Sequence, residues 1–382
     1  MSSTERFRSL DVMRGLAMVL MAIDHVRVYS GLPAGGDTAG IFFTRWITHF
    51  VAPAFCFLAG TGAFLHGRTL GDLRLLSRFL ITRGLLLVAL ELTVIRMLWT
   101  FNLDFAHYNL AGVIWMLGWC MILLAGLVRF STRTIAIIGL LIIFAQQLVA
   151  APTYAMSESV KQSVGWIWQF LYFGGPIDST PPIAVLYSIV PWIGVMAVGY
   201  AFGAVMLLDA VARRRTCLRI GLGGTALFVV VAGLMVLVRP APEDAGPALF
   251  RFLGQRKYPA SQLFLLMTLG PIIALLPVAE RANGWMSNVL AVFGRVPLFY
   301  YLLHIPIIHT LALVVSLVRD GRMSPWLFAN HPMQPPPQPD GYMWSLGMLY
   351  TVFVVAVALL YLPCRWYMQV KTRRKDSWLR FI

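Results

Sequence analysis

The stretch LDVMRGLAMVLMAIDHVRVYS, residues 10–30, is long and apolar enough to cross a bilayer as one helix. It nevertheless carries Asp11, Arg14, Asp24, His25 and Arg27. An ionised side chain at mid-bilayer costs about 3 kcal/mol on insertion scales, so such groups persist where they pair or line a watery cavity. We therefore expect this helix to face the interior of a bundle and to contribute functional residues.

The rest of the chain repeats the apolar pattern. Of 382 residues, 59% are hydrophobic and 12% charged, and the mean hydropathy is +0.74, whereas soluble domains carry about 25% charged residues. The sequence predicts one all-α, polytopic membrane bundle over residues 1–382, its N-terminal segment being a retained helix and not a cleaved signal peptide. The ten expected spans are 9–29, 41–65, 78–98, 110–128, 134–151, 184–209, 218–238, 260–278, 296–318 and 343–364.

The basic residues predict the orientation of the bundle. With the N-terminus inside, the inner segments hold 19 Lys and Arg residues and the outer segments 7, a bias that favours both termini in the cytoplasm. Residues 365–382 then form a basic cytoplasmic tail. The net charge of +15 is explained by lipid headgroups and orientation, without a nucleic-acid partner. The four cysteines form no CxxC pattern, so no metal site is expected.

Arg14 and His25 share one face of the first helix. Eleven residues turn an α-helix to within about 20° of the starting direction and raise it about 16 Å. Arginine suits a phosphate or a polarised carbonyl, and histidine suits proton transfer. The alternatives are an interfacial ion pair of Asp11 with Arg14 and a structural hydrogen bond of His25. Asp24 points about 100° away from His25 and is a candidate to orient a neighbour.

Further polar residues lie within later spans. Arg45 and His49 share a face near the outer end of the second span, where they could bind an acceptor, although Arg45 could also snorkel to the interface. Glu91 lies in the middle of the third span, with Arg83 and Arg96 before and after it, and a structural ion pair is the favoured interpretation of this group.

The ninth span contains two histidines and two prolines. Pro297 and Pro306 are expected to bend this helix, which would let His304 reach a central cavity, while a packed core histidine is the alternative. His309 lies less deep and is the weaker candidate. Three outer loops, 152–183, 239–259 and 319–342, are expected to be irregular and either cover an outward-facing cavity or act as linkers.

Five motifs occur in the order found in one known family. They are SLDVMRGLAMVLMAIDHVR (9–27), FFTRWITHFVAPAFCFLAGTGAFL (42–65), SRFLITRGLLLVALELTVIR (77–96), PWIGVMAVGYAFG (191–203) and FGRVPLFYYLLHIPIIH (293–309). The chain resembles, over nearly its whole length, the bacterial branch of the heparan-alpha-glucosaminide N-acetyltransferase catalytic-domain family, which is related to the acyltransferase 3 proteins.

The resemblance implies a multi-pass protein of a bacterial inner membrane that takes acetyl-CoA or another acyl-CoA from the cytoplasm. It also implies an acceptor, usually a sugar, acylated on the outer side. Arg14 and His25 match the active-site pattern of the acyltransferase 3 relatives. The lysosomal member has Asn where this chain has His25, and its active-site histidine falls in a region that here is Gly-rich, so a role for His49 stays open.

We therefore expect an acyltransferase in which His25 is the general base and Asp24 or His49 orients it. Arg14 would hold the thioester end of the donor. The remaining candidate binding residues are Asp11, Arg27, Arg45, Glu91 and His304. Covalent acyl transfer through histidine and homodimer formation are left open. The rival hypothesis is a transporter or flippase with an intramembrane Arg, Asp and His relay.

Overall fold

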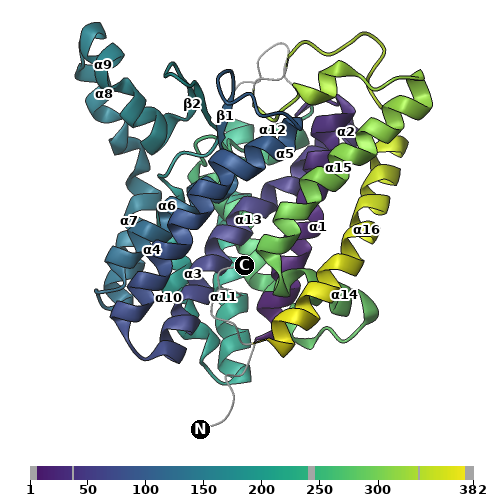
Figure 1. Cartoon of the computed structure of the whole chain (residues 1–382). Coiled ribbons are helices and arrows are strands. Elements are labelled where there is room, and N and C mark those ends of the chain that lie inside the picture. The colour runs from purple at the N-terminus through teal and green to yellow at the C-terminus, as the bar shows by residue number, and fades with distance from the viewer. Residues whose placement is uncertain (1–6, 37, 240–245, 334–335, 375–382) are drawn as a thin grey trace.

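The computed structural model describes residues 7–36, 38–239, 246–333 and 336–374, and it is a bundle of long helices capped at one end by a small sheet (Figure 1). The helices of the first half are α1 (Arg8–Ser30), α2 (Ala39–Trp46), α3 (Val51–Leu70), α4 (Leu73–Leu90), α5 (Arg96–Thr100), α6 (Val113–Leu127), α7 (Thr132–Ala145), α8 (Ala151–Ala155) and α9 (Glu158–Trp168). Those of the second half are α10 (Trp192–Met206), α11 (Ala210–Val238), α12 (Ala248–Leu253), α13 (Gln262–Arg281), α14 (Trp285–Arg295), α15 (Pro297–Asp320) and α16 (Leu346–Arg373).

Short helical turns continue several of these helices. A 3-10 turn, η1 (Ile47–Phe50), joins α2 to α3, and a π-helical turn, η2 (Glu91–Ile95), joins α4 to α5. The other turns are η3 (Gln146–Val149), η4 (Gln169–Phe173) and η5 (Pro325–Phe328). Each of the ten predicted spans contains a helix, and α14 lies between the eighth and ninth of these spans.

The helices have the length and composition of membrane spans. Among the described residues, six helical segments are long and apolar enough to cross a bilayer: Ala39–Leu70, Thr132–Tyr154, Ala210–Val238, Gln262–Arg281, Pro297–Asp320 and Leu346–Arg373. Apolar helices α6 and α10 are shorter, whereas α1 and α4 are long but more charged. The predicted all-α polytopic membrane fold is confirmed.

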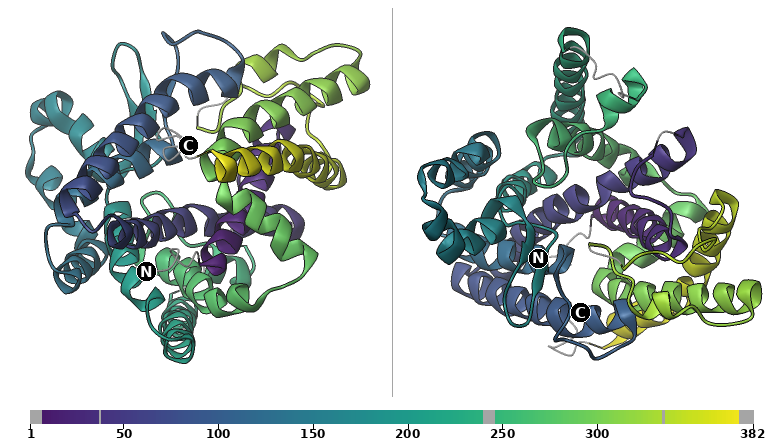
Figure 2. Two further views of the ribbon diagram at one scale, coloured as in Figure 1. Left: turned by 60° about the horizontal axis from the view of Figure 1, so that its bottom comes forward. Right: turned by 90° about the horizontal axis from the view of Figure 1, so that it is seen from above.

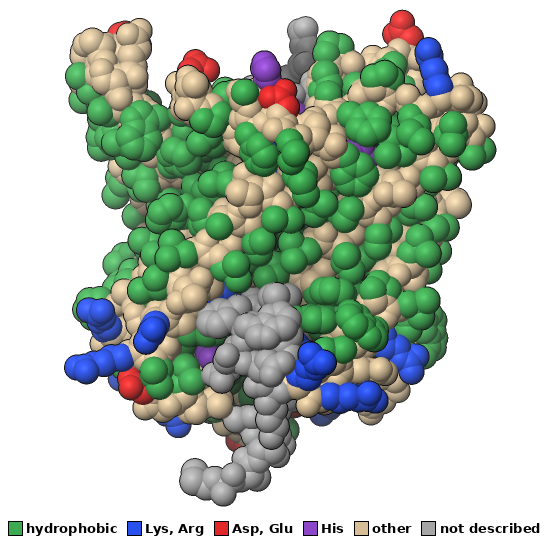
Figure 3. Space-filling model, in the orientation of Figure 1, with side chains coloured by type: hydrophobic (Ala, Val, Ile, Leu, Met, Phe, Trp, Pro, Cys, Tyr) green, Lys and Arg blue, Asp and Glu red, His purple; other side chains and the backbone are tan. Residues whose placement is uncertain are grey.

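The surface agrees with this assignment. Hydrophobic side chains cover the middle of the visible face, and Lys and Arg gather near its lower end (Figure 3). Helix α1 begins at this end and α16 finishes there (Figure 1). The basic tail predicted for 365–382 begins as the last turns of α16, which reaches Arg373, and residues 375–382 lie outside the described part of the chain.

The fourth and sixth predicted spans begin too early. The fourth starts in strand β1 (Asn109–Ala111), and the sixth starts in β3 (Ile183–Val185), well before α10 begins at Trp192. In the sheet, β3 is the central strand, parallel to β1 and antiparallel to β2 (Gly175–Ile177). A short apolar strand and a short apolar stretch of helix have the same hydropathy, which explains both errors.

The outer loops contain more helix than predicted. The first, 152–183, holds most of α8 and all of α9, which form an arm that rises beside the bundle (Figure 1). The second holds α12, and the third holds η5. These two loops also contribute residues to the outer cavity described below.

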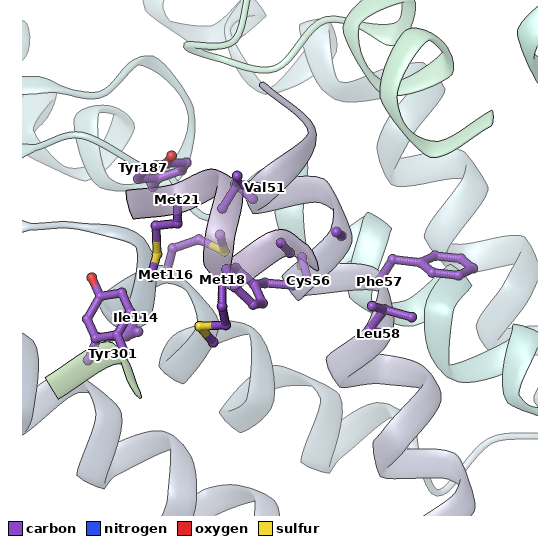
Figure 4. Packing of buried hydrophobic residues seen from close by; sticks show 14 of the residues in the cluster. Met18, Met21, Val51, Cys56, Phe57, Leu58, Ile114, Met116, Tyr187 and Tyr301 are labelled. Carbon is purple, nitrogen blue, oxygen red and sulfur yellow. The ribbon is translucent and has the colours of Figure 1, made fainter. Parts of the chain in front are cut away.

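Helix α1 lies in the interior of the bundle, whereas α11 lies at its rim (Figure 2). A Cβ added at Gly15 would lie 1.8 Å from Leu290 O, and one added at Gly294 would lie 1.8 Å from Asp11 O. These two glycines therefore allow the backbones of α1 and α14 to touch. Around α1, buried apolar residues of several helices pack together, among them Met18, Met21 and Met116 (Figure 4).

Glycines also bring α3 and α10 close together. A Cβ at Gly199 would lie 2.2 Å from Phe57 O, and one at Gly60 would lie 2.1 Å from Met196 O. Helices α3 and α10 thus meet through small residues, as transmembrane helices commonly do.

Candidate functional site

A large cavity lies between the basic ends of several helices. Its volume is ≈ 390 Å³, and it is lined by α1, α3, α4, α6, α14, α15 and α16. Arg14, Arg83, Arg295 and Lys371 supply four cationic side chains to its wall, and the remainder of the wall is largely apolar. We call this space the inner cavity. It can hold a ligand that has an anionic part and an apolar or amide-containing part.

Asp11 connects two of these cations. Its Oδ1 lies 3.9 Å from Nη1 of Arg14, and its Oδ2 lies 3.6 Å from Nε of Arg295. Arg14 also donates to the carbonyl oxygen of Leu58 at 3.0 Å. The predicted Asp11–Arg14 pair therefore exists, but it belongs to a three-residue group that fixes Arg14 in the cavity wall.

A second, smaller cavity lies toward the other end of α1. Its volume is ≈ 50 Å³, and Asp24, His25, Glu91, Lys257 and Tyr258 are among its lining residues. We call this space the outer cavity. Val113 and Tyr301 line both cavities. The two spaces therefore adjoin, with one of them beside Arg14 and the other beside His25.

His25 pairs with His304, a residue 279 positions away. Nδ1 of His25 lies 2.6 Å from Nε2 of His304, with the ring centroids 4.7 Å apart and the ring planes 25° apart. Nδ1 of His304 lies 2.6 Å from the carbonyl oxygen of Tyr301. A carbonyl only accepts, so Nδ1 of His304 must carry the proton, and in the neutral ring its Nε2 then accepts from Nδ1–H of His25.

This chain of hydrogen bonds fixes the tautomer of His25. With its Nδ1 protonated, the neutral imidazole has its lone pair on Nε2, which can accept a proton. Trp99 holds the ring from the side, with centroids 4.9 Å apart at 69°. The arrangement resembles the way a general base is positioned by a third group in hydrolases, with a histidine in place of the usual carboxylate.

Asp24 is held by two arginines and not by His25. Its Oδ1 accepts from Nε of Arg27 at 2.9 Å, and its Oδ2 accepts from Nη1 of Arg45 at 2.7 Å. Arg27 also donates to the carbonyl of Leu32. The structure thus brings Arg27 and Arg45 to one carboxylate, and Arg45 does not snorkel to the interface.

Glu91 and His49 have surroundings that differ from those expected. Oε2 of Glu91 accepts from the backbone N–H of Ile114 at 3.0 Å and of Trp115 at 3.3 Å, at the N-terminus of α6, so Glu91 caps a helix where an ion pair was favoured. His49 packs edge-on against Phe264, and its buried Nδ1 has no hydrogen-bond partner among the described residues.

Two further polar residues of the predicted spans, His309 and Arg96, line neither cavity. His309 stacks on Tyr29 and Phe101, at centroid distances of 4.7 and 3.9 Å. Arg96 donates to the carbonyl of Tyr108 and to the hydroxyl of Thr100, both at 2.8 Å. Both residues tie the segment that follows α5, residues 101–108, to the bundle.

The sequence interpretation missed part of the outer cavity. Lys257 was counted only as an outer basic residue, and Tyr187 and Tyr258 were not singled out, although all three line this space. Lys257 and Tyr258 stand beside Pro259, just before the eighth predicted span. This short loop segment has no helical periodicity that would mark its side chains as facing the interior. Among the described residues, no group of three His, Cys, Asp or Glu side chains could hold a metal ion.

A family model described as "Heparan-alpha-glucosaminide N-acetyltransferase, catalytic" matches residues 6–239, more than half of the chain. The match includes Arg14, His25 and Glu91, while Lys257, Arg295 and His304 lie beyond its end. No curated protein matches the chain.

Proposed function

The chain belongs to the heparan-alpha-glucosaminide N-acetyltransferase catalytic-domain family, and from that premise we propose that it transfers an acetyl group across the membrane. The donor would be acetyl-CoA from the cytoplasm, and the acceptor would be a hydroxyl or amine of an extracytoplasmic sugar or small molecule. The observation that carries the proposal is that the inner and outer cavities meet at Val113 and Tyr301, with the His25–His304 pair beside the junction.

The inner cavity suits the donor. CoA carries its phosphates at one end and its thioester at the other, joined by the long pantetheine arm. Arg14, Arg83, Arg295 and Lys371 provide cations for phosphate or carbonyl oxygens. The arm would run along the apolar wall and bring the thioester to the junction at Tyr301.

His25 would act as the general base. Its Nε2 takes the proton from the acceptor hydroxyl or amine as that group attacks the thioester carbonyl. The carbon–sulfur bond then breaks, and the CoA thiolate leaves and recovers the proton from the imidazolium. His304 is a positioning residue, since it holds Nδ1–H of His25 and thereby exposes Nε2. An acyl-histidine route would use the same nitrogen as nucleophile.

The test is acetyl transfer by purified protein in proteoliposomes with labelled acetyl-CoA and a panel of sugar and amine acceptors. His25→Ala is expected to lose roughly 100-fold or more of kcat. His107→Ala is the matched control, because this exposed histidine pairs with Asp104 and lines neither cavity. Full transfer by His25→Ala would exclude this mechanism. Movement of the acceptor with no new ester or amide would favour the transporter instead. Protein label that is released by hydroxylamine at neutral pH and is absent from His25→Ala would identify the acyl-histidine route.

A further inference from the structure

Lys257 is a buried cation in the wall of the outer cavity. Its backbone lies in the turn before α13, where residues 257 and 260 form an isolated β-bridge. The residue is only 7% exposed, and it lines the same cavity as His25. A lysine at this depth is usually paired with a carboxylate, because burying an unpaired ammonium is costly.

No carboxylate of the described residues forms an ion pair with Lys257. The nearby carboxylate of Asp24 has one oxygen bonded to Arg27 and the other to Arg45. Glu91, which lines the same cavity, accepts from two backbone N–H groups. Both acidic groups of the outer cavity are therefore already engaged, and Lys257 adds a positive charge that they do not balance.

The immediate neighbours of the ammonium are two tyrosine rings. Nζ lies 5.5 Å from the ring centroid of Tyr187 and 5.2 Å from that of Tyr258. The two phenol oxygens lie 3.4 Å apart, with Tyr258 as donor. Aromatic faces stabilise a cation partly. The Tyr258 hydroxyl also interacts with the ammonium, and an ammonium has three donors in all.

The pKa of the Tyr258 phenol is lowered by the same excess of positive charge. Burial raises the pKa of its phenol, but the Lys257 ammonium and the Arg45 guanidinium outweigh burial and bring that pKa below its ordinary value. Burial also lowers the pKa of Lys257. A bound anion would offset the cost of burying the Lys257 ammonium, since it supplies a full negative charge and further acceptors.

We propose that Lys257, with the hydroxyls of Tyr187 and Tyr258, recognises an anionic substituent of the acceptor, such as a carboxylate or a phosphate, and so makes the enzyme selective for anionic acceptors. The inference rests on the proposed function, because it assigns the acceptor to the outer cavity. Anchoring the anionic group at Lys257 would bring a hydroxyl or amine of the acceptor into the space that Lys257 shares with His25. Lys257 lies beyond the end of the range that the family model matches, residues 6–239.

The experiment compares matched ligand pairs that differ in one anionic group: galacturonate with galactose, and glucose 6-phosphate with glucose. Thermal unfolding of the detergent-purified protein measures binding, and acetyl transfer from acetyl-CoA measures kcat/KM. A charge-assisted hydrogen bond predicts a preference of roughly 10- to 100-fold for the charged member of a pair. Lys257→Met should reduce that ratio toward one, and Lys257→Arg should restore part of it.

Lys161→Met is the control, because Lys161 is an outer lysine paired with Glu158 at 2.6 Å on the α9 arm. Wild-type protein that binds both members of each pair equally, or a Lys257→Met variant that keeps the preference, would overturn the proposal. The unfolding temperature of ligand-free Lys257→Met shows whether the variant is folded. Binding preference without any acetyl transfer would refute the proposed function and leave the anion site standing.

Discussion

The hydrogen bond between His25 and His304 gives the sharpest test of the mechanism. In His304→Leu, Nδ1–H of His25 loses its acceptor, and leaving such a buried donor unsatisfied costs about 1–3 kcal/mol. His25 escapes this cost by rotating or by moving its proton to Nε2, and either change removes the base. We therefore expect kcat to fall roughly 5- to 150-fold, while the KM for acetyl-CoA changes little.

Glutamine at position 304 should rescue much of this loss. Its amide N–H₂ can donate to the carbonyl of Tyr301 while its carbonyl accepts from His25, which are the two roles that the histidine fills. His309→Leu is the control, because it makes the same change in a buried histidine of α15 outside both cavities. Steady-state acetyl transfer at saturating acceptor measures kcat. An unchanged kcat in His304→Leu, or equal losses in the leucine and glutamine variants, would refute the positioning role.

Three further predictions concern the donor, the outer loops and the packing of α1. Arg14→Gln should raise the KM for acetyl-CoA roughly tenfold, as expected for one lost charge-assisted bond, and initial rates at varied acetyl-CoA measure it. Burial and the nearby Arg96 lower the pKa of His331 to about 4. Folding therefore favours the neutral form of His331. Its contribution to the free energy of unfolding should be complete above pH 6.5 and should be lost as the pH falls from 6.5 to 4. In His331→Phe, the unfolding temperature should depend less on pH between 6.5 and 4. Gly294→Ala should lower the unfolding temperature by several degrees, because its Cβ would collide with the backbone of α1, and Gly233→Ala, with no atom within 4 Å, should not.

The fold followed from hydropathy because a bilayer imposes a minimum length of apolar helix. The first span, predicted at 9–29, is α1 at Arg8–Ser30. The errors lie where apolar chain at the outer end is extended, as in β1 and β3. Membrane length alone cannot distinguish such strands from the first turns of the next helix.

The polar residues of the cavities were predictable one by one, but their partners were not. The cost of burying Arg14, His25, Glu91 and His304 in a span marked each of them as a candidate. Which side chains meet depends on helix packing, and the two histidines are 279 residues apart. Adjacency along the chain suggested Asp24 as an orienting group for His25, yet neighbours on a helix diverge by about 100°, and Asp24 meets two arginines instead.

The direction of α1 links the topology to the chemistry. Arg14 lies in the wall of the inner cavity and His25 in that of the outer cavity, so the mechanism requires the basic end of the bundle to face the donor. The excess of Lys and Arg at that end predicts that it faces the cytoplasm. Vesicles of known orientation test this: inside-out vesicles should use acetyl-CoA added to the medium, whereas right-side-out vesicles should need it loaded inside. The reverse pattern would contradict the assignment of the two cavities, because donor and acceptor would then approach the wrong ends of α1.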